Sequence, residues 1–116
     1  MQAKDNLILN KSFDFALKTI DLTVKISETK LFAVSNQLLK SGTSIGANVR
    51  EAQSPESLPD FIHKMKIAGK EAEETEYWLL LCKHSEHLPD PGPLLDEVRS
   101  MQKIIGSIIS TSKKRL

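Results

Sequence analysis

The stretch SGTSIGANVREA, residues 41–52, contains two glycines, two serines, a threonine and an asparagine where the spacing of apolar residues predicts a helix. A glycine inside a helix costs about 1 kcal/mol relative to alanine, and close packing of a neighbouring backbone can offset that cost. Gly42 and Gly46 are four residues apart, so they share one helix face. We interpret them as positions where another helix packs closely against this one.

Outward from this stretch, apolar residues recur at helical spacing in four blocks, and none of the blocks alternates as a β-strand would. The predicted helices span about residues 11–28, 31–53, 58–86 and 93–112. Short connections between helices produce antiparallel neighbours. The predicted fold is therefore all-α, an antiparallel up-down four-helix bundle that residues 1–116 form as a single domain. A third helix of about 25 residues would reach roughly 37 Å, so the bundle should be elongated.

Each predicted helix has a stripe of residues that we expect to face the core. Phe15, Ala16, Leu22 and Ile26 broaden the stripe of the first helix, and Cys82, the single cysteine, should be a buried thiol. The inward stripes are Phe13, Leu17, Ile20 and Val24; Leu31, Leu38, Ile45, Val49 and Ala52; Phe61, Met65, Ala68, Ala72, Thr75, Leu79 and Cys82; and Leu94, Val98, Met101, Ile105 and Ile108.

A second, polar stripe runs along the helix of residues 31–53, and two carboxylates occupy a corresponding stripe of the next helix. If the stripes meet, their side chains form one polar cluster, which must be hydrogen-bonded or paired to be tolerated. The alternative is that Glu71 and Glu74 belong to an ordinary charged surface. The predicted cluster comprises Ser44, Asn48, Glu51, Glu71 and Glu74.

Composition and motifs argue against several classes of function. The net charge of +1 gives no global attraction to nucleic acid or to a membrane. The N-terminus lacks an apolar run long enough for a secretory signal, so we expect a cytoplasmic protein. The His84-x-x-His87 pair lies at a frayed helix end, and there is no phosphate loop or nucleophile elbow. We predict neither an enzyme nor a metal or cofactor site.

Two runs of sequence resemble a known bacterial family. NQLLKSGTSIGANVREAQS and DFIHKMKIAGKEAEETEYWLLL closely resemble the 23S rRNA-intervening sequence proteins, over about residues 12–110. The resemblance implies an antiparallel four-helix bundle that forms a ring-like homopentamer. A related branch is the accessory protein of diversity-generating retroelements, which is strongly basic and binds nucleic acid. The family's signature positions fall on Ser41, Gly42, Ser44, Gly46, Asn48, Glu51, Glu71, Glu74, Tyr77 and Trp78.

Three hypotheses of function remain open from the sequence. The first is a non-enzymatic oligomeric scaffold, because apolar residues lie on more than one helix face and a lone small bundle has too few helices to cover them. The second is a module that binds RNA or a ribonucleoprotein through lysine-bearing faces and the SKKRL tail. The third is an adaptor for a partner protein. The predicted subunit contacts of the scaffold are Ile67, Tyr77, Trp78 and Leu81.

Overall fold

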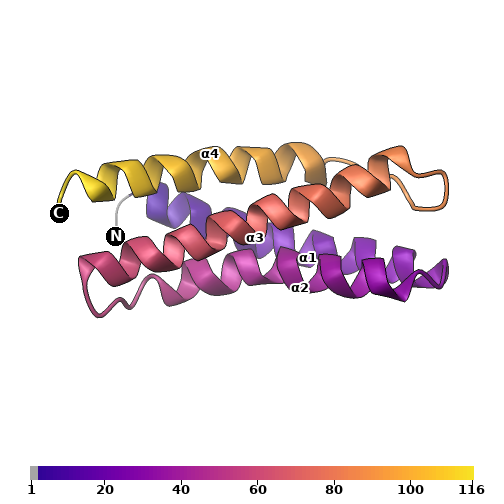
Figure 1. Ribbon diagram of the computed structural model, residues 1–116, viewed down its shortest axis with the longest axis horizontal. Helices are drawn as coiled ribbons and strands as arrows, with labels where there is room; N and C mark the ends of the chain where they lie inside the picture. Colours follow the sequence, from indigo (N-terminus) through magenta and orange to yellow (C-terminus); the bar gives the residue numbers. More distant parts are fainter. Residues whose placement is uncertain (1–2) are drawn as a thin grey trace.

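The structure, a computed structural model, describes residues 3–116, with side chains from residue 6 onward. Four helices follow one another along the chain, and the described residues contain no strand. They are α1 (Ala3–Glu28), α2 (Phe32–Glu51), α3 (Leu58–His84) and α4 (Leu94–Lys113). Consecutive helices run antiparallel, and the predicted all-α four-helix bundle is confirmed (Figure 1).

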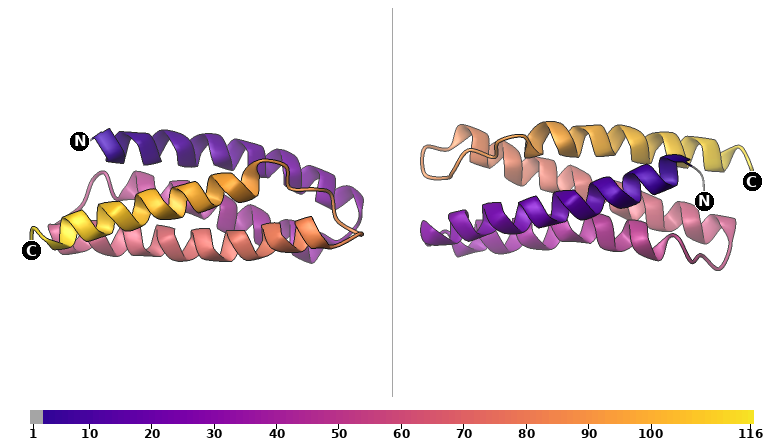
Figure 2. Two further views of the ribbon diagram at one scale, coloured as in Figure 1. Left: turned by 90° about the horizontal axis from the view of Figure 1, so that it is seen from above. Right: turned by 180° about the vertical axis from the view of Figure 1, so that it is seen from behind.

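The helices are arranged around the bundle in chain order. α1 packs against α2 and α4, and α3 packs against the same two helices. The two chain ends and the α2–α3 connection lie at one end of the bundle, and the other two connections lie at the opposite end (Figures 1 and 2). The bundle measures 47 × 21 × 18 Å, so it is elongated as predicted.

The helix ends follow local sequence chemistry. Ser57 caps α3, because its hydroxyl oxygen accepts a hydrogen bond of 3.1 Å from the Asp60 backbone N–H. The Asp60 carboxylate in turn accepts one of 3.1 Å from the Glu56 N–H. Before α4, Gly92 adopts a positive φ of 59° that its lack of a side chain permits. α1 begins at Ala3 rather than near residue 11, and its added turns bury Ile8 completely.

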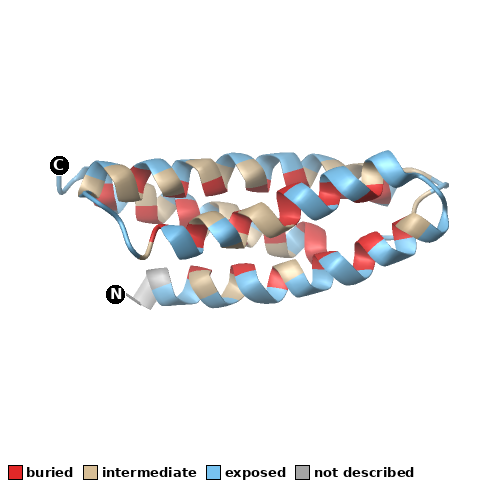
Figure 3. Ribbon diagram, turned by 90° about the horizontal axis from the view of Figure 1, so that it is seen from below, coloured by how far each residue is buried: buried red, intermediate tan, exposed pale blue. Residues whose placement is uncertain are grey.

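The core stripes predicted for α2, α3 and α4 are mostly confirmed (Figure 3). One predicted core residue is wrong. Leu31 precedes α2 and is exposed, because the chain turns there through a positive φ at Lys30. Phe61 is only partly buried, although it packs against the core, and its neighbour Ile62 is buried. The remaining predicted positions are buried: Leu38, Ile45, Val49, Ala52, Met65, Ala68, Ala72, Thr75, Leu79, Cys82, Leu94, Val98, Met101, Ile105 and Ile108.

The core stripe predicted for α1 is wrong. Phe13, Leu17, Ile20 and Val24 were expected inside the bundle, and all four are exposed. The broadening residues Phe15, Leu22 and Ile26 are buried, together with Ile8 and three hydroxyl residues. The hydroxyls of Ser12, Thr19 and Thr23 donate to the carbonyls of Leu9, Phe15 and Ile20 in their own helix, at 3.2, 2.9 and 2.8 Å. Burial therefore leaves none of these hydroxyls without a partner.

The buried hydroxyl face of α1 packs against the glycines of α2. A Cβ added to Gly42 would lie 2.6 Å from Cγ2 of Thr19, and one added to Gly46 would lie 3.2 Å from the backbone oxygen of Ser12. Gly42 and Gly46 therefore lie where α1 and α2 approach most closely, and the neighbour they admit is α1 rather than α3. Small residues on both helices make that approach possible.

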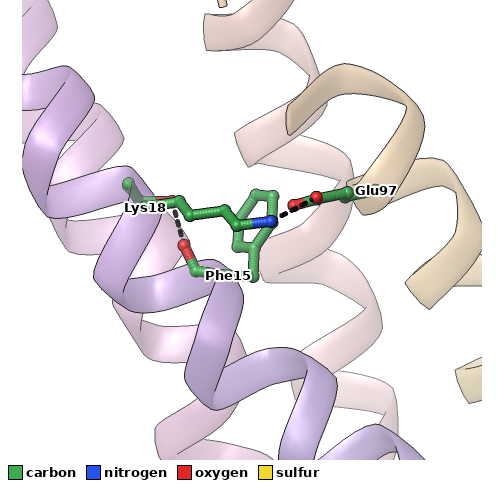
Figure 4. A network of polar contacts seen from close by, with 4 residues as sticks. Phe15, Lys18 and Glu97 are labelled. Atoms are coloured by element: carbon green, nitrogen blue, oxygen red, sulfur yellow. Dashed lines mark hydrogen bonds and ion pairs between the residues drawn. The ribbon is translucent and has the colours of Figure 1, made fainter. Parts of the chain in front are cut away.

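α1 is joined to α4 by a surface ion pair. Lys18 Nζ donates to Glu97 Oε1 at 2.6 Å, above the region where Phe15 enters the core (Figure 4). The two side chains are 51% and 31% exposed, so the pair should contribute at most about 1 kcal/mol. None of the described helices combines the length and the apolar content needed to cross a bilayer.

Candidate interaction surfaces

Most of the exposed large apolar residues of the described chain lie on the neighbouring helices α1 and α2. Phe13, Leu17, Ile20 and Val24 are 55%, 50%, 41% and 56% exposed, and their spacing of four, three and four residues keeps them on one side of α1. α2 adds Phe32, which is 56% exposed, and Leu39. We call these six residues the α1–α2 outer face. Scattered exposed apolar residues are normal, whereas an aligned group of this size is a candidate interaction surface.

Polar and charged residues border the α1–α2 outer face. Asp14, Asp21 and Glu28 are exposed and seven residues apart, so they form a carboxylate stripe one position after the apolar one. A hollow of about 140 Å³ lies between α1 and α2 beside Phe13, with Arg50 at its rim. The apolar stripe thus has an acidic border on α1, away from α2.

The polar residues predicted to form a cluster lie on the α2–α3 face. Asn48 donates through Nδ2 to the Ser44 carbonyl of its own helix at 2.8 Å. The Glu51 side chain is 61% exposed, and its nearest cation is Lys64 on α3, at 3.9 Å. Within the described part of the chain, no hydrogen bond joins Asn48 or Glu51 to a carboxylate of α3.

The two carboxylates of α3 have different surroundings. Glu71 is half-buried, and burial raises its pKa, as does the nearby charge of Glu74, whereas Lys40 lowers it. Glu74 is exposed and accepts a hydrogen bond of 3.1 Å from the indole N–H of Trp78. A buried hydrogen bond of 2.9 Å joins α2 to α3, in which the Thr75 hydroxyl donates to the Ser41 hydroxyl. The spacing of apolar residues predicted Thr75 as a core position and did not predict this contact.

The predicted subunit contacts lie on the same α2–α3 face. Tyr77 is 55% exposed and packs edge-on against Trp78, with ring centroids 5.1 Å apart and planes at 72°. Ile67, Trp78 and Leu81 are half-buried in the single chain. Edge-to-face packing and the Glu74 bond fix the Trp78 ring, so this patch is more covered by its own chain than the α1–α2 outer face is.

The described residues were compared with the requirements of a metal site and of a reactive thiol. No group of three or more His, Cys, Asp and Glu side chains is placed to hold a metal ion among the residues that the structure describes. Cys82 is buried, and burial raises the pKa of its thiol to about 11, so the reactive thiolate is scarce near neutral pH. The most distinctive surface feature of the described residues is the α1–α2 outer face.

Comparison with known proteins identifies relatives over most of the chain. The family described as 23S rRNA-intervening sequence protein matches residues 4–107. A solved structure from Bacteroides thetaiotaomicron, of a protein of unknown function in the S23 ribosomal protein family, is 43% identical in sequence. The similarity covers 92% of this chain and 98% of that one, with a TM-score of 0.85. No curated protein sequence matches this chain.

Proposed function

This chain belongs to the 23S rRNA-intervening sequence protein family, and on that premise we propose that it is a non-enzymatic interaction module that assembles with copies of itself in the cytoplasm. The observation that carries the proposal is the α1–α2 outer face, where six large apolar side chains face solvent in the single chain. Burying apolar surface gains about 25 cal/mol per Å², so these side chains favour association.

The arrangement of the outer face supports contact with a folded partner rather than with a flexible peptide. Its α1 residues follow a heptad spacing along a straight helix, which is the pattern that packs against another helix. A second copy of the same chain would supply such a helix. The family resemblance extends the proposal to a homopentamer, in which Ile67, Tyr77, Trp78 and Leu81 would be further subunit contacts.

Protection of a thiol placed on the outer face tests this proposal. In the variant Val24→Cys, the new thiol is exposed in a single chain and covered in the proposed assembly, while Cys82 reacts little because it is buried. We expect maleimide to modify Val24→Cys at least about tenfold more slowly than Thr111→Cys, whose thiol lies at an exposed site on α4. If dissociation of the assembly costs more than about 1.4 kcal/mol, fewer than a tenth of the Val24→Cys thiols are exposed at any time. Equal rates at low micromolar protein concentration would overturn the proposal.

A second candidate function follows from the charges along the bundle. When each helix is divided at its midpoint and residues 6–116 are counted, the half that contains both chain ends holds eight basic and four acidic residues, and the other half holds seven and nine. Glu71 lies at the midpoint of α3. The near-zero net charge therefore conceals a basic end and an acidic end. A basic end favours contact with the phosphates of RNA.

RNA binding at the basic end has a direct test. Replacing Lys113, Lys114 and Arg115 together by serine should weaken binding to a ribosomal RNA fragment and reduce its dependence on salt concentration, because fewer counterions are released. Gel shifts of both proteins across a salt series measure the effect. Binding that is indifferent to salt and to the triple substitution would exclude this candidate.

A further inference from the structure

An open groove of about 600 Å³ lies between α3 and α4, on the side of the bundle opposite the α1–α2 outer face. Ile105 and Ile109 of α4 form its apolar floor, and Lys66 and Lys70 of α3 stand at its rim. Both lysines are exposed, and no ion pair engages either of them within the described residues. Glu73 and Glu76 also line the groove, and Glu76 is paired with Arg99. Within the described residues, the unpaired charges of the lining are therefore the two lysines and Glu73.

Gly106 lies in this groove, and no packing contact among the described residues accounts for it. A Cβ added to Gly42, Gly46 or Gly69 would touch another helix, at 2.6, 3.2 and 3.5 Å respectively. A Cβ added to Gly106 would meet nothing within 4 Å. Glycine at this position therefore costs about 1 kcal/mol of helix propensity without admitting a helix of its own chain. The lack of a side chain at Gly106 would let a helix of another molecule pack closely there.

The α1 helix of a second copy has the chemistry that matches the groove. Its exposed residues Phe13, Leu17 and Ile20 are apolar, as is the groove floor. The carboxylates of Asp14 and Asp21 border that stripe, and the lysines of the groove carry the opposite charge. Long lysine side chains can adjust to carboxylates spaced along a helix, so the two surfaces complement each other in polarity, and they complement each other in charge at the end of the groove that holds Lys66 and Lys70.

We propose that the α1 stripe of one copy seats in the α3–α4 groove of the next. This inference rests on the proposed self-assembly and specifies its contact. Because the two surfaces lie on opposite sides of one bundle, each copy offers a donor surface and an acceptor surface at the same time. The contact is heterologous, so the same contact repeats from copy to copy instead of closing a symmetric pair.

Two single-surface variants test the contact. Gly106→Leu fills the acceptor groove, and the folded chain tolerates it because its Cβ meets no atom. Leu17→Glu disables the donor stripe. Each variant alone should associate at least about tenfold more weakly than the natural protein, as measured by light scattering after size exclusion. Thr111→Leu, exposed on α4 and outside the groove lining, should assemble normally.

Mixing the two variants gives the decisive result. The intact stripe of the Gly106→Leu protein should bind the intact groove of the Leu17→Glu protein, yielding a complex of two 13.0 kDa chains that grows no further. Lys70→Glu should behave as Gly106→Leu does. An absence of heterodimer, or normal assembly of Gly106→Leu, overturns the groove contact and leaves self-assembly standing. A monomeric natural protein overturns both proposals.

Discussion

The substitution Leu17→Glu is expected to convert the assembled protein into folded monomers. Leu17 is 50% exposed in the single chain, so water solvates the new carboxylate as long as the chain is alone. In the assembly the same carboxylate would lie over the apolar floor of the groove, between Asp14 and Asp21. Those two carboxylates already face the rim lysines Lys66 and Lys70, so the new charge would be buried without a cation of its own. Burying an unpaired charge costs several kcal/mol, and about 3 kcal/mol weakens association more than a hundredfold.

Two measurements separate dissociation from unfolding in this variant. Light scattering should report a single chain, while circular dichroism should report unchanged helix content. Thr111→Glu is the matched control, because it adds the same charge to an exposed position on α4 outside both proposed surfaces. If Leu17→Glu keeps the mass of the natural protein, the α1–α2 outer face does not mediate assembly. Loss of helix content would instead show that Leu17 supports the fold.

The substitution Gly42→Leu is expected to destabilise the fold itself. Even the first added carbon would lie 2.6 Å from the Thr19 methyl group, and the rest of the side chain would have to separate α1 from α2. Overpacking of this kind costs at least about 2 kcal/mol, which corresponds to a fall of about 10 °C in Tm for a domain of this size. Thermal and denaturant unfolding at one fixed protein concentration measure the loss.

Two companion variants identify the cause of that loss. Ala33→Leu makes a comparable change at an exposed position of the same helix, and its stability should stay within about 0.5 kcal/mol of the natural protein. Thr19→Ser removes the methyl group that Gly42→Ala would meet and keeps the hydroxyl, so the two substitutions should couple favourably in a double-mutant cycle. Additive effects would show that Thr19 does not make Gly42 necessary.

Helical periodicity predicts most of the core positions of α2, α3 and α4, because the most regular apolar stripe of each of these helices is the buried one. α1 has two apolar stripes of similar size. Phe13 and Leu17 lie on one face, and Phe15 and Leu22 lie on another, so the sequence of α1 alone cannot say which is buried. The choice depends on α2, whose glycines admit small hydroxyl residues such as Thr19 and exclude larger ones. Packing against α2 therefore determines which apolar stripe of α1 is buried, and the local sequence pattern does not.

The candidate surfaces show the same limit. The spacing of Gly42 and Gly46 identifies their shared helix face, but it does not say that α1 is the neighbour. Asn48 was expected to contribute to a polar cluster, and its amide bonds its own helix backbone instead of a carboxylate of α3. The outer face was missed because exposed apolar residues at heptad spacing have the same pattern as a core. Only the three-dimensional arrangement distinguishes a second apolar face from the first.

The molecular mass of the natural protein in solution tests the central claim most directly. Sedimentation equilibrium at low micromolar concentration should give a mass that is a multiple of 13.0 kDa and falls toward that value on dilution. The α1–α2 outer face would then be covered in the working state of the protein. A stable mass of 13.0 kDa over the whole concentration range would contradict the account, because the exposed apolar face would have no second copy to cover it.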